Sequence, residues 1–379
     1  MRKKLLFIVN VDWFFVSHRL PIAIEALKQG YEVHIATAVT DKLSLLEGSG
    51  LTVHSLSLHR SRSGFIKVVT EFLEILSLFH KISPDIVHLV TIKPVLFGGI
   101  AARLMKVPSV VSAISGLGFV FVKTNFFGWF RRKIISFLYR LALTHPNQKI
   151  IFQNADDQSQ ICKLANLPVG RTVLIHGSGV NLSLYNMQKL PVGVPIVLLA
   201  ARLLRDKGVS EFVGAAKLVN SSGIRANFVL VGEVDPSNPE SIEQSEIDSW
   251  KIDGEVEIWG YRDDMDQVLS LATIVVLPSY REGFPKVLIE AAACGRAVVT
   301  TDVPGCRDAI EDGITGLLVP VHDAKAIADA VLELLNNPQY CEQLGKSGRE
   351  RAERVFDLRL IVAKHISIYE KLISTSNNQ

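Results

Sequence analysis

The sequence predicts an α/β protein built from two doubly wound, Rossmann-like domains, each a parallel sheet with helices on both faces. Three observations support this fold class. The chain has 379 residues, more than the roughly 100–200 residues of one ordinary domain. Short runs rich in β-branched residues alternate with longer amphipathic segments, which is the pattern of βαβ units. This alternation weakens once, near residue 190, and then restarts.

The individual elements follow from hydrophobic periodicity and from the turn residues between the runs. In the first half of the chain, strands are expected at 5–9, 32–36, 86–89 and 109–112, with helical patterns at 20–29 and 65–82. In the second half, strands are expected at 196–200, 227–231, 256–259, 274–277, 297–300 and 316–319, again with helices between them. A long helical pattern at 355–372 ends the chain.

The domain boundary is expected at residue 190, where two prolines and a glycine interrupt the pattern in the run LPVGVP. The net charge reverses at the same place, from +12 in residues 1–190 to −9 in residues 191–379. We therefore expect a first domain at 1–190 and a second at 191–354. The final segment, 355–379, is a helix that could pack back on the first domain.

Several protein classes are disfavoured by what the sequence lacks. The turn after the first strand, from Asn10 to Arg19, contains no glycine, so a dinucleotide-binding dehydrogenase is not expected. The four cysteines form no Cys-x-x-Cys pair, which favours reduced thiols in a cytosolic protein without a structural zinc. The basic half shows no motif that interleaves aromatic residues with cations, so no nucleic-acid partner is expected. An anionic membrane surface, a phosphorylated substrate and a merely solvated basic face all remain open.

No membrane-spanning segment is expected. The basic start and the apolar run after it imitate a signal peptide, but Asp12 interrupts the run early. The uncharged stretch at 107–122 is shorter than the ~20 residues that cross a bilayer.

The segment from Leu277 to Gly295 is the most informative for chemistry. A strand is expected to end near Leu277, and a helix to begin near Pro285, a residue favoured at helix starts. Glu282 then lies in the loop at the carboxyl end of a strand, and Glu290 lies in the helix. A helix start binds phosphate through its unpaired N–H groups, so two carboxylates beside it suggest a nucleotide-sugar site. The alternative is that Glu290 only forms a surface pair with Lys286, four residues earlier.

A second group of residues is expected at the same edge of the sheet. Arg202 and Lys207 leave the strand at 196–200, and two cations there could neutralise a diphosphate without a divalent metal. The alternative is a solvated turn before the helix that begins near Ser210.

The runs ARLLRDKG, EGFPKVLIEAAACG and TTDVPGCRDAIEDGITGLLVP resemble the donor domain of glycosyltransferase family 4, retaining enzymes of the GT-B fold whose two domains face a cleft. The resemblance covers nearly all of the second domain, whereas the first domain matches more loosely. It implies that Arg202 and Lys207 bind the donor diphosphate, Glu282 the transferred sugar and Glu290 the ribose. The remaining donor contacts that it implies are the backbone around Gly283, Phe284 and Pro285, and the base site near Gly232, Glu233, Tyr261 and Arg262.

No metal or other cofactor is implied by this resemblance. The run Asp264-Met-Asp266 superficially matches the metal motif of another glycosyltransferase fold. Because it directly precedes a helical pattern, helix capping is the preferred interpretation.

The first domain departs from the family. Ser115 stands where many relatives carry a histidine, and His88 could face the cleft or be satisfied inside the structure. The run ISGLGFVF, which contains Gly116 and Gly118, is similar to bacterial members that add N-acetylhexosamines to sugars on undecaprenyl diphosphate. Three further residues share that similarity and are expected on the acceptor side: Asp12, His18 and Arg19.

An aromatic segment with a basic end suggests contact with lipid. Phe126 and Trp129 precede Arg131, Arg132 and Lys133, so apolar and cationic groups adjoin, as they do in segments that lie in the membrane interface. A core-packed helix with a basic end is the alternative.

Together these features predict a retaining glycosyltransferase that moves a sugar, expected to be an N-acetylhexosamine, from UDP to a lipid-linked saccharide. It would act in the cytoplasm, peripherally on the inner face of the cell membrane. Front-face attack is implied, with the departing diphosphate helping to take the acceptor's proton. A UDP-sugar epimerase of the same fold and a non-catalytic scaffold that binds nucleotide-sugars are the alternatives.

Overall fold

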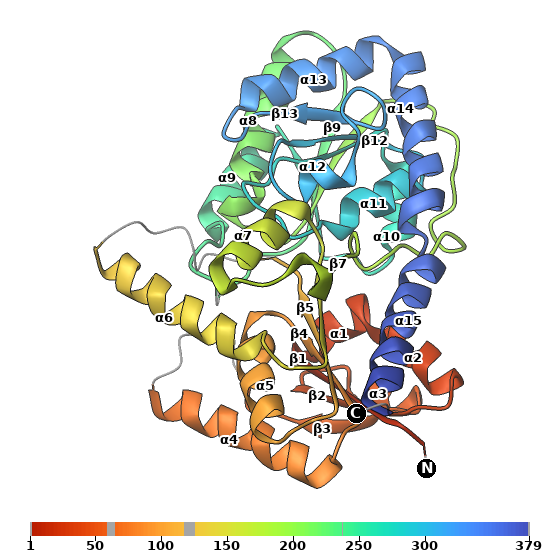
Figure 1. Ribbon diagram of the computed structural model, residues 1–379. Coiled ribbons are helices and arrows are strands. Elements are labelled where there is room, and N and C mark those ends of the chain that lie inside the picture. The colour runs from red at the N-terminus through yellow and green to blue at the C-terminus, as the bar shows by residue number, and fades with distance from the viewer. Residues whose placement is uncertain (1, 59–64, 117–125, 237, 378–379) are drawn as a thin grey trace. The chain divides into compact units, whose positions relative to one another are not determined.

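The computed structural model describes residues 2–58, 65–116, 126–236 and 238–377 (Figure 1). At residues 65, 126–132 and 377 only the backbone is described. The chain forms two compact units, Met1–Ser178 with Leu360–Gln379, and Gly179–Arg359. We refer to these as the first and second unit.

The first unit contains a seven-stranded parallel sheet with the order β3-β2-β1-β4-β5-β6-β7. The strands are β1 (Lys4–Val11), β2 (Glu32–Ala38), β3 (Thr52–Ser55), β4 (Ile86–Val90), β5 (Ser109–Ile114), β6 (Gln148–Phe152) and β7 (Thr172–Leu174). The residues of β4 and β5 are all buried, as expected for central strands covered on both faces. The strand order reverses between β1 and β4, and this reversal defines the switch point of the sheet.

Helices cover both faces of this sheet, because buried apolar residues form one cluster on each side. The helices are α1 (Asp12–His18), α2 (Leu20–Lys28), α3 (Leu43–Gly48), α4 (Phe65–Ile82), α5 (Ile92–Leu104), α6 (Phe126–Ala142), α7 (Ala155–Ala165) and α15 (Leu358–Asn377). Helix α5 packs between α4 and α6, and α15 returns to this unit from the end of the chain (Figure 1).

The second unit repeats the architecture with six parallel strands in the order β10-β9-β8-β11-β12-β13. They are β8 (Ile196–Ala200), β9 (Asn227–Val231), β10 (Glu257–Gly260), β11 (Ile274–Leu277), β12 (Ala297–Thr301) and β13 (Leu317–Val319). Its helices are α8 (Val209–Ser221), α9 (Gln244–Asp253), α10 (Met265–Leu271), α11 (Lys286–Ala293), α12 (Cys306–Ala309), α13 (Ala324–Asn336) and α14 (Pro338–Arg351). The switch point of this sheet lies between β8 and β11.

The predicted fold class, two doubly wound α/β domains, is confirmed. The division between the units differs from the expected one at residue 190, since it lies between Ser178 and Gly179. The segment before residue 190 belongs to the second unit because Val180 and Tyr185 pack into its core. The buried side chain of Arg296 also donates to the carbonyl oxygens of Gln188 and Lys189. A proline-rich interruption therefore marks a loop within the second unit.

Candidate donor site in the second unit

Lys207 and Glu282 meet at the switch point of the second sheet. Lys207 comes from the loop after β8 and Glu282 from the loop after β11, which are the two loops that flank the reversal in strand order. The Lys207 Nζ lies 2.5 Å from the Glu282 Oε1, and the two side chains are only 17% and 15% exposed. In open α/β sheets, ligands bind outside the carboxyl ends of the strands at such a reversal. The structure therefore brings together two of the residues predicted to bind the donor.

Two glycines hold these loops backbone to backbone. A Cβ at Gly208 would lie 2.2 Å from the carbonyl oxygen of Pro278, so only glycine permits this approach. A Cβ at Gly305, in the loop after β12, would lie 2.5 Å from the carbonyl oxygen of Gly283. Both glycines have positive φ, +70° and +82°, which other L-residues rarely adopt. The glycines that trail the predicted motif thus fix the position of Glu282.

The charge of Lys207 is stabilised by its acidic neighbours. Burial alone would lower the pKa of Lys207, but the charge of Glu282, its hydrogen bond and the charge of Asp206 together outweigh burial, so the pKa is raised above its ordinary value. The hydroxyl of Ser279, which is fully buried, donates to the same Glu282 Oε1 at 2.8 Å. The Ser279 carbonyl in turn accepts from the hydroxyl of Thr301. The site thus offers a buried, permanently charged ammonium beside a fixed carboxylate.

Arg202 lies in the loop after β8 but pairs with a different carboxylate. Its Nη1 lies 2.9 Å from the Asp235 Oδ2, in the segment after β9, and its side chain is 46% exposed. The Arg202 guanidinium and the Lys207 ammonium are therefore at the same edge of the sheet, each with its own acidic partner. Asp235 was not identified from the sequence, because nothing in its local pattern distinguishes it from a solvated loop residue.

Glu290 is a buried residue of α11, only 6% exposed. Its Oε1 lies 3.1 Å from the Lys286 Nζ, and the hydroxyl of Tyr185 also bonds to its carboxylate. The Lys286–Glu290 pair, predicted as the alternative role of Glu290, is therefore present, but Glu290 is buried and the pair does not lie on the surface. Burial and Glu290 together raise the pKa of Tyr185, so this phenol stays a hydrogen-bond donor.

The start of α11 matches the prediction closely. The helix begins at Lys286 with Pro285 as the N-cap residue, and no side chain caps it. The Phe284 ring packs edge-to-face against Phe356, with the centroids 5.5 Å apart. Phe284 is thus an anchor for the loop, and only its backbone is suited to contact a donor.

The region predicted to hold the base lies at the same edge of the sheet. Gly232 has φ +140°, and a Cβ there would lie 1.9 Å from the carbonyl oxygen of Ala201. Its N–H donates to Gly260, at the end of β10. The loops after β8, β9 and β10 are therefore linked through their backbones. Glu233 and Tyr261 are exposed, the latter by 68%.

The expectation of helix capping holds for the position of Asp264 but not for a bond from its side chain. Asp264 is the N-cap residue of α10, and its carbonyl accepts from Gln267 and Val268, but its carboxylate makes no capping bond. The carboxylate instead receives Arg262, whose Nε lies 2.7 Å from the Oδ1. Among the described residues, no three His, Cys, Asp or Glu side chains are grouped so that they could hold a metal ion.

Asp206 is a residue that the sequence did not single out. It lies next to Lys207 in η3 (Arg205–Lys207), and its buried Oδ1 has no hydrogen-bond partner in the described structure. Burial raises its pKa, Lys207 lowers it, and the charge of Glu282 raises it further. The one sequence signal for this residue is an acidic side chain directly beside Lys207.

Several residues predicted on the acceptor side lie in the interior of the first unit. Asp12 is fully buried and accepts from the backbone and hydroxyl of Thr40, both at 2.6 Å. His88 is also fully buried and bonds to the Tyr369 hydroxyl at 2.6 Å. Arg19, 1% exposed, donates to the His18 carbonyl. The alternative of an interior histidine therefore describes the position of His88, although its Nε2, like the Nε of Arg19, has no hydrogen-bond partner in the described structure.

The structure describes only some of the other residues predicted to be functional in the first unit. His18 stacks on Phe14, with the ring centroids 4.1 Å apart. Ser115 and Gly116 follow β5 and are partly exposed, whereas Gly118 lies outside the described residues. Lys133 is exposed on α6. The side chains of Phe126, Trp129, Arg131 and Arg132 also lie outside what is described. None of the described helices has the length and apolar character needed to cross a bilayer.

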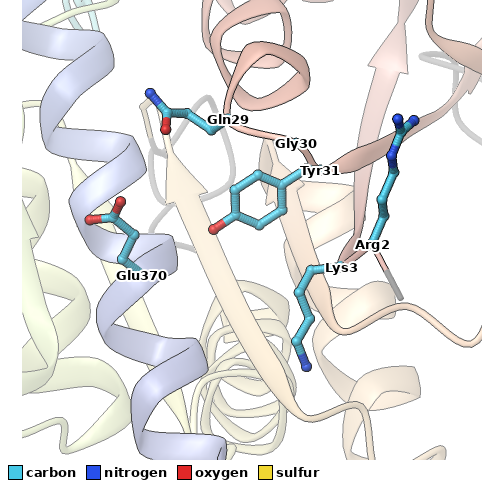
Figure 2. A pocket seen from close by; sticks show the side chains of 6 residues that line it. All are labelled: Arg2, Lys3, Gln29, Gly30, Tyr31 and Glu370. Carbon is cyan, nitrogen blue, oxygen red and sulfur yellow. The ribbon is translucent and has the colours of Figure 1, made fainter.

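A hollow of about 650 Å³ in the first unit lies away from these residues (Figure 2). Five of its six lining residues directly precede β1 or β2, at the amino edge of the sheet, and the sixth, Glu370, lies on α15. They are Arg2, Lys3, Gln29, Gly30, Tyr31 and Glu370. No predicted site residue lines this hollow.

Comparison with known proteins shows similarity along nearly the whole chain. Residues 186–351 match the profile "Glycosyl transferases group 1", and residues 4–154 match "Glycosyl transferase 4-like". A curated relative from Campylobacter jejuni is 29% identical over 95% of this chain and 98% of its own. It is named N,N'-diacetylbacillosaminyl-diphospho-undecaprenol alpha-1,3-N-acetylgalactosaminyltransferase.

Solved structures show the same fold. A sucrose-phosphate synthase from Thermosynechococcus elongatus has a TM-score of 0.79 at 22% identity, with 99% of this chain and 100% of that one covered. The Anabaena protein HepE, in complex with UDP and glucose, has a TM-score of 0.76 at 18% identity, with 97% and 100% covered. The predicted GT-B fold is thereby confirmed.

Proposed function

The chain belongs to the glycosyltransferases, with a group 1 region in its second unit and a 4-like region in its first, and from this premise we propose its reaction. It transfers a sugar, an N-acetylhexosamine, from a UDP-sugar to a lipid-linked saccharide in bacterial glycan assembly. The anomeric configuration is retained, and no metal ion takes part.

The Lys207–Glu282 pair at the switch point carries this proposal. The bond between the anomeric carbon and the diphosphate oxygen breaks, and negative charge builds on UDP as it leaves. A buried ammonium that is already charged and already positioned stabilises that charge without reorganisation. The diphosphate would compete with Glu282 for Lys207, which leaves carboxylate oxygens of Glu282 able to accept from sugar hydroxyls.

Arg202 supplies a second cation in this scheme. The guanidinium can leave Asp235 for the diphosphate with little loss of free energy, because the Arg202–Asp235 pair is substantially exposed and exposed ion pairs are weak. The uncapped start of α11 adds N–H donors for a phosphate. Glu290, held by Lys286 and Tyr185, is placed to accept from ribose hydroxyls.

No general base is needed for retention by front-face attack. The acceptor hydroxyl attacks the same face that the diphosphate leaves, and its proton passes to the departing diphosphate oxygen. The new carbon–oxygen bond thus replaces the old one, and the products are UDP and the extended saccharide. Positioning and charge stabilisation then supply most of the rate enhancement.

The nature of donor and acceptor is supported by the relatives and by charge. HepE is described in complex with UDP, and the Campylobacter relative is named for a diphospho-undecaprenol acceptor. Residues 1–190 carry a net charge of +12, which suits the anionic surface where a lipid-linked substrate is found. We therefore place the protein peripherally on the cytoplasmic face of the membrane.

The direct test is turnover with defined donors. The protein is incubated with UDP-N-acetylglucosamine, UDP-N-acetylgalactosamine, UDP-glucose or UDP-galactose, with and without a bacterial lipid extract, in the presence of EDTA. We expect UDP release that depends on lipid and favours an N-acetylated donor, and an α-linked product by NMR. Interconversion of free UDP-sugars would indicate an epimerase instead, and binding of UDP-sugar without release would indicate a scaffold.

A further inference from the structure

Two polar side-chain atoms stand without partners at the switch point of the first sheet. Among the described residues, the Asn10 Oδ1 and the Thr91 Oγ1 are covered by protein and make no hydrogen bond. Ile8 of β1 pairs with Leu89 of β4, so Asn10 and Thr91 lie two residues further along these neighbouring strands. This is the carboxyl edge at which the strand order reverses, where doubly wound domains bind ligands.

The backbone of Thr91 is strained. It has φ +73° and ψ 165°, a region that is almost confined to glycine. The conformation is enforced from both sides, because the Thr91 N–H donates to Ala113 at 3.2 Å and its carbonyl accepts from Val95 at 3.0 Å. A β-branched residue in this region is uncommon, and such strain persists mainly where a binding or catalytic site requires it.

A buried ion pair involves the first turn of α5, two residues after Thr91. The Lys93 Nζ lies 2.8 Å from one oxygen of Glu71 and 2.6 Å from the other. The Glu71 side chain is completely buried, whereas that of Lys93 is 23% exposed. The pair is electrically neutral as a whole, so it does not favour a phosphate, but it offers both donors and acceptors.

We propose that Asn10, Thr91 and the Lys93–Glu71 pair form a subsite for hydroxyl groups of the acceptor saccharide. A sugar hydroxyl both donates and accepts, which matches an amide oxygen, a threonine hydroxyl and a neutral ion pair. Asn10 and Thr91 are partly exposed residues, so side-chain rotation is enough to present their covered atoms to a ligand. This inference rests on the proposed function, because it requires a saccharide acceptor.

Three of the predicted acceptor residues do not compete for this role. Asp12, Arg19 and His88 are at most 1% exposed, and each has a partner inside the first unit. The subsite instead uses the ends of the two strands that flank the reversal.

The test compares acceptor and donor dependence in the full-length protein. The variants are Thr91→Val, which removes the hydroxyl but keeps the shape, and Asn10→Ala, with Thr52→Val on the exposed edge strand β3 as the matched control. The probe is a bacterial lipid extract, titrated at saturating UDP-sugar. For each site variant we expect the concentration of extract that gives the half-maximal rate to rise about 5-fold, as loss of one hydrogen bond predicts. For Thr52→Val we expect no change in this concentration.

Donor-side readouts separate this inference from the proposed function. Half-saturation by UDP-sugar and slow hydrolysis of the donor without lipid should stay within 2-fold of wild type in every variant. Unchanged extract dependence in both site variants would overturn the subsite while leaving the glycosyltransferase proposal intact. Absence of UDP release from the wild-type protein would overturn the proposed function itself.

A stability measurement tests the strain independently of turnover. Thr91→Gly removes the side chain that makes this backbone conformation costly, so its melting temperature should be at least that of wild type while its extract dependence weakens. A clearly lower melting temperature would show that Thr91 is kept for the fold, and would contradict the subsite.

Discussion

The ammonium of Lys207 and the carboxylate of Glu282 form a largely buried ion pair, 2.5 Å long, between loops that leave the neighbouring strands β8 and β11. Neither residue is close to the other in sequence, and the pair exists because Gly208 and Gly305 let the loops approach. A buried pair is weak evidence for stability, because desolvation offsets much of the attraction. Its position at the switch point makes a binding role the better account.

Removing the charge of Glu282 tests its contact with the transferred sugar. We expect Glu282→Gln to lower kcat by about 10²-fold or more, because a contact made in the transition state is lost. UDP should bind at least as tightly as to the wild type, since UDP lacks the sugar and the neutral side chain no longer competes with the diphosphate for Lys207. The matched control is Glu333→Gln on the exposed part of α13, which should leave kcat unchanged. Near-normal turnover in the Glu282 variant would contradict the assignment.

A methyl group at Gly305 tests the support of this loop. Its Cβ would approach the Gly283 carbonyl to 2.5 Å, at φ +82°, so Gly305→Ala should destabilise the fold by about 1–3 kcal/mol. Surviving protein should show reduced kcat because Glu282 is displaced. Gly48→Ala, where a Cβ meets nothing within 4 Å, is the control, and equal urea midpoints for the two variants would refute the packing argument.

Acid should weaken the first unit through two interior histidines. His88 and His365 stack with centroids 5.7 Å apart, beside Tyr369 and the fully buried Arg19. Burial lowers the pKa of both, with Arg19 contributing, and that of His365 falls to about 3. The unfolded chain, with a histidine pKa of about 6.5, binds these protons first. The contribution of the two neutral histidines to the free energy of unfolding is therefore fully present above pH ~6.5 and is lost as the pH falls toward 3.

The slope of stability against pH measures this effect. Each histidine adds up to about 1.4 kcal/mol per pH unit below pH ~6, so urea unfolding between pH 7.5 and 5 should show a shallower dependence in His365→Gln. His322→Gln is the control, because that side chain is 61% exposed. Identical slopes for wild type and His365→Gln would show that this histidine is not the titrating group.

Membrane association is tested by reversing the charge of the basic segment in the first half of α6. Replacement of Arg131, Arg132 and Lys133 by Glu should reduce sedimentation with phosphatidylglycerol vesicles, because each cation near an anionic surface contributes about 1 kcal/mol. Replacement of Lys217, Lys251 and Lys325 in the second unit by Glu matches the change in charge. A similar loss in both variants would reveal an effect of net charge alone.

Much of the fold followed from the sequence because central strands are apolar and regularly spaced. The strands β8, β9 and β11 have the predicted bounds. The strands β3, β6 and β7 were missed. The residues of β3 and β7 are at best half-buried, and β6 begins with Gln148 and Lys149, so none of the three carries a continuous apolar run.

The placement of the candidate donor residues was predicted better than that of the candidate acceptor residues, for a physical reason. Lys207, Glu282 and Pro285 lie in short loops whose position follows directly from the strands beside them. The partner Asp235 comes from a different loop than Arg202, which no local pattern reveals. Ser279 lies only three residues before Glu282, but a serine in a loop carries no signal of its own. In the first unit, Asp12 was predicted from the family similarity and His88 from its place at a strand end, yet Asp12 bonds to Thr40 and His88 to Tyr369 in the interior.

The binding of UDP to full-length Lys207→Met, measured by calorimetry at neutral pH, tests the central assignment most directly. If Lys207 holds the leaving diphosphate, its loss should weaken UDP binding at least ~10-fold, as removal of a charged hydrogen bond does, while Glu282→Gln should bind UDP at least as tightly as the wild type. Equal UDP affinity in the wild-type and Lys207→Met proteins would contradict the account.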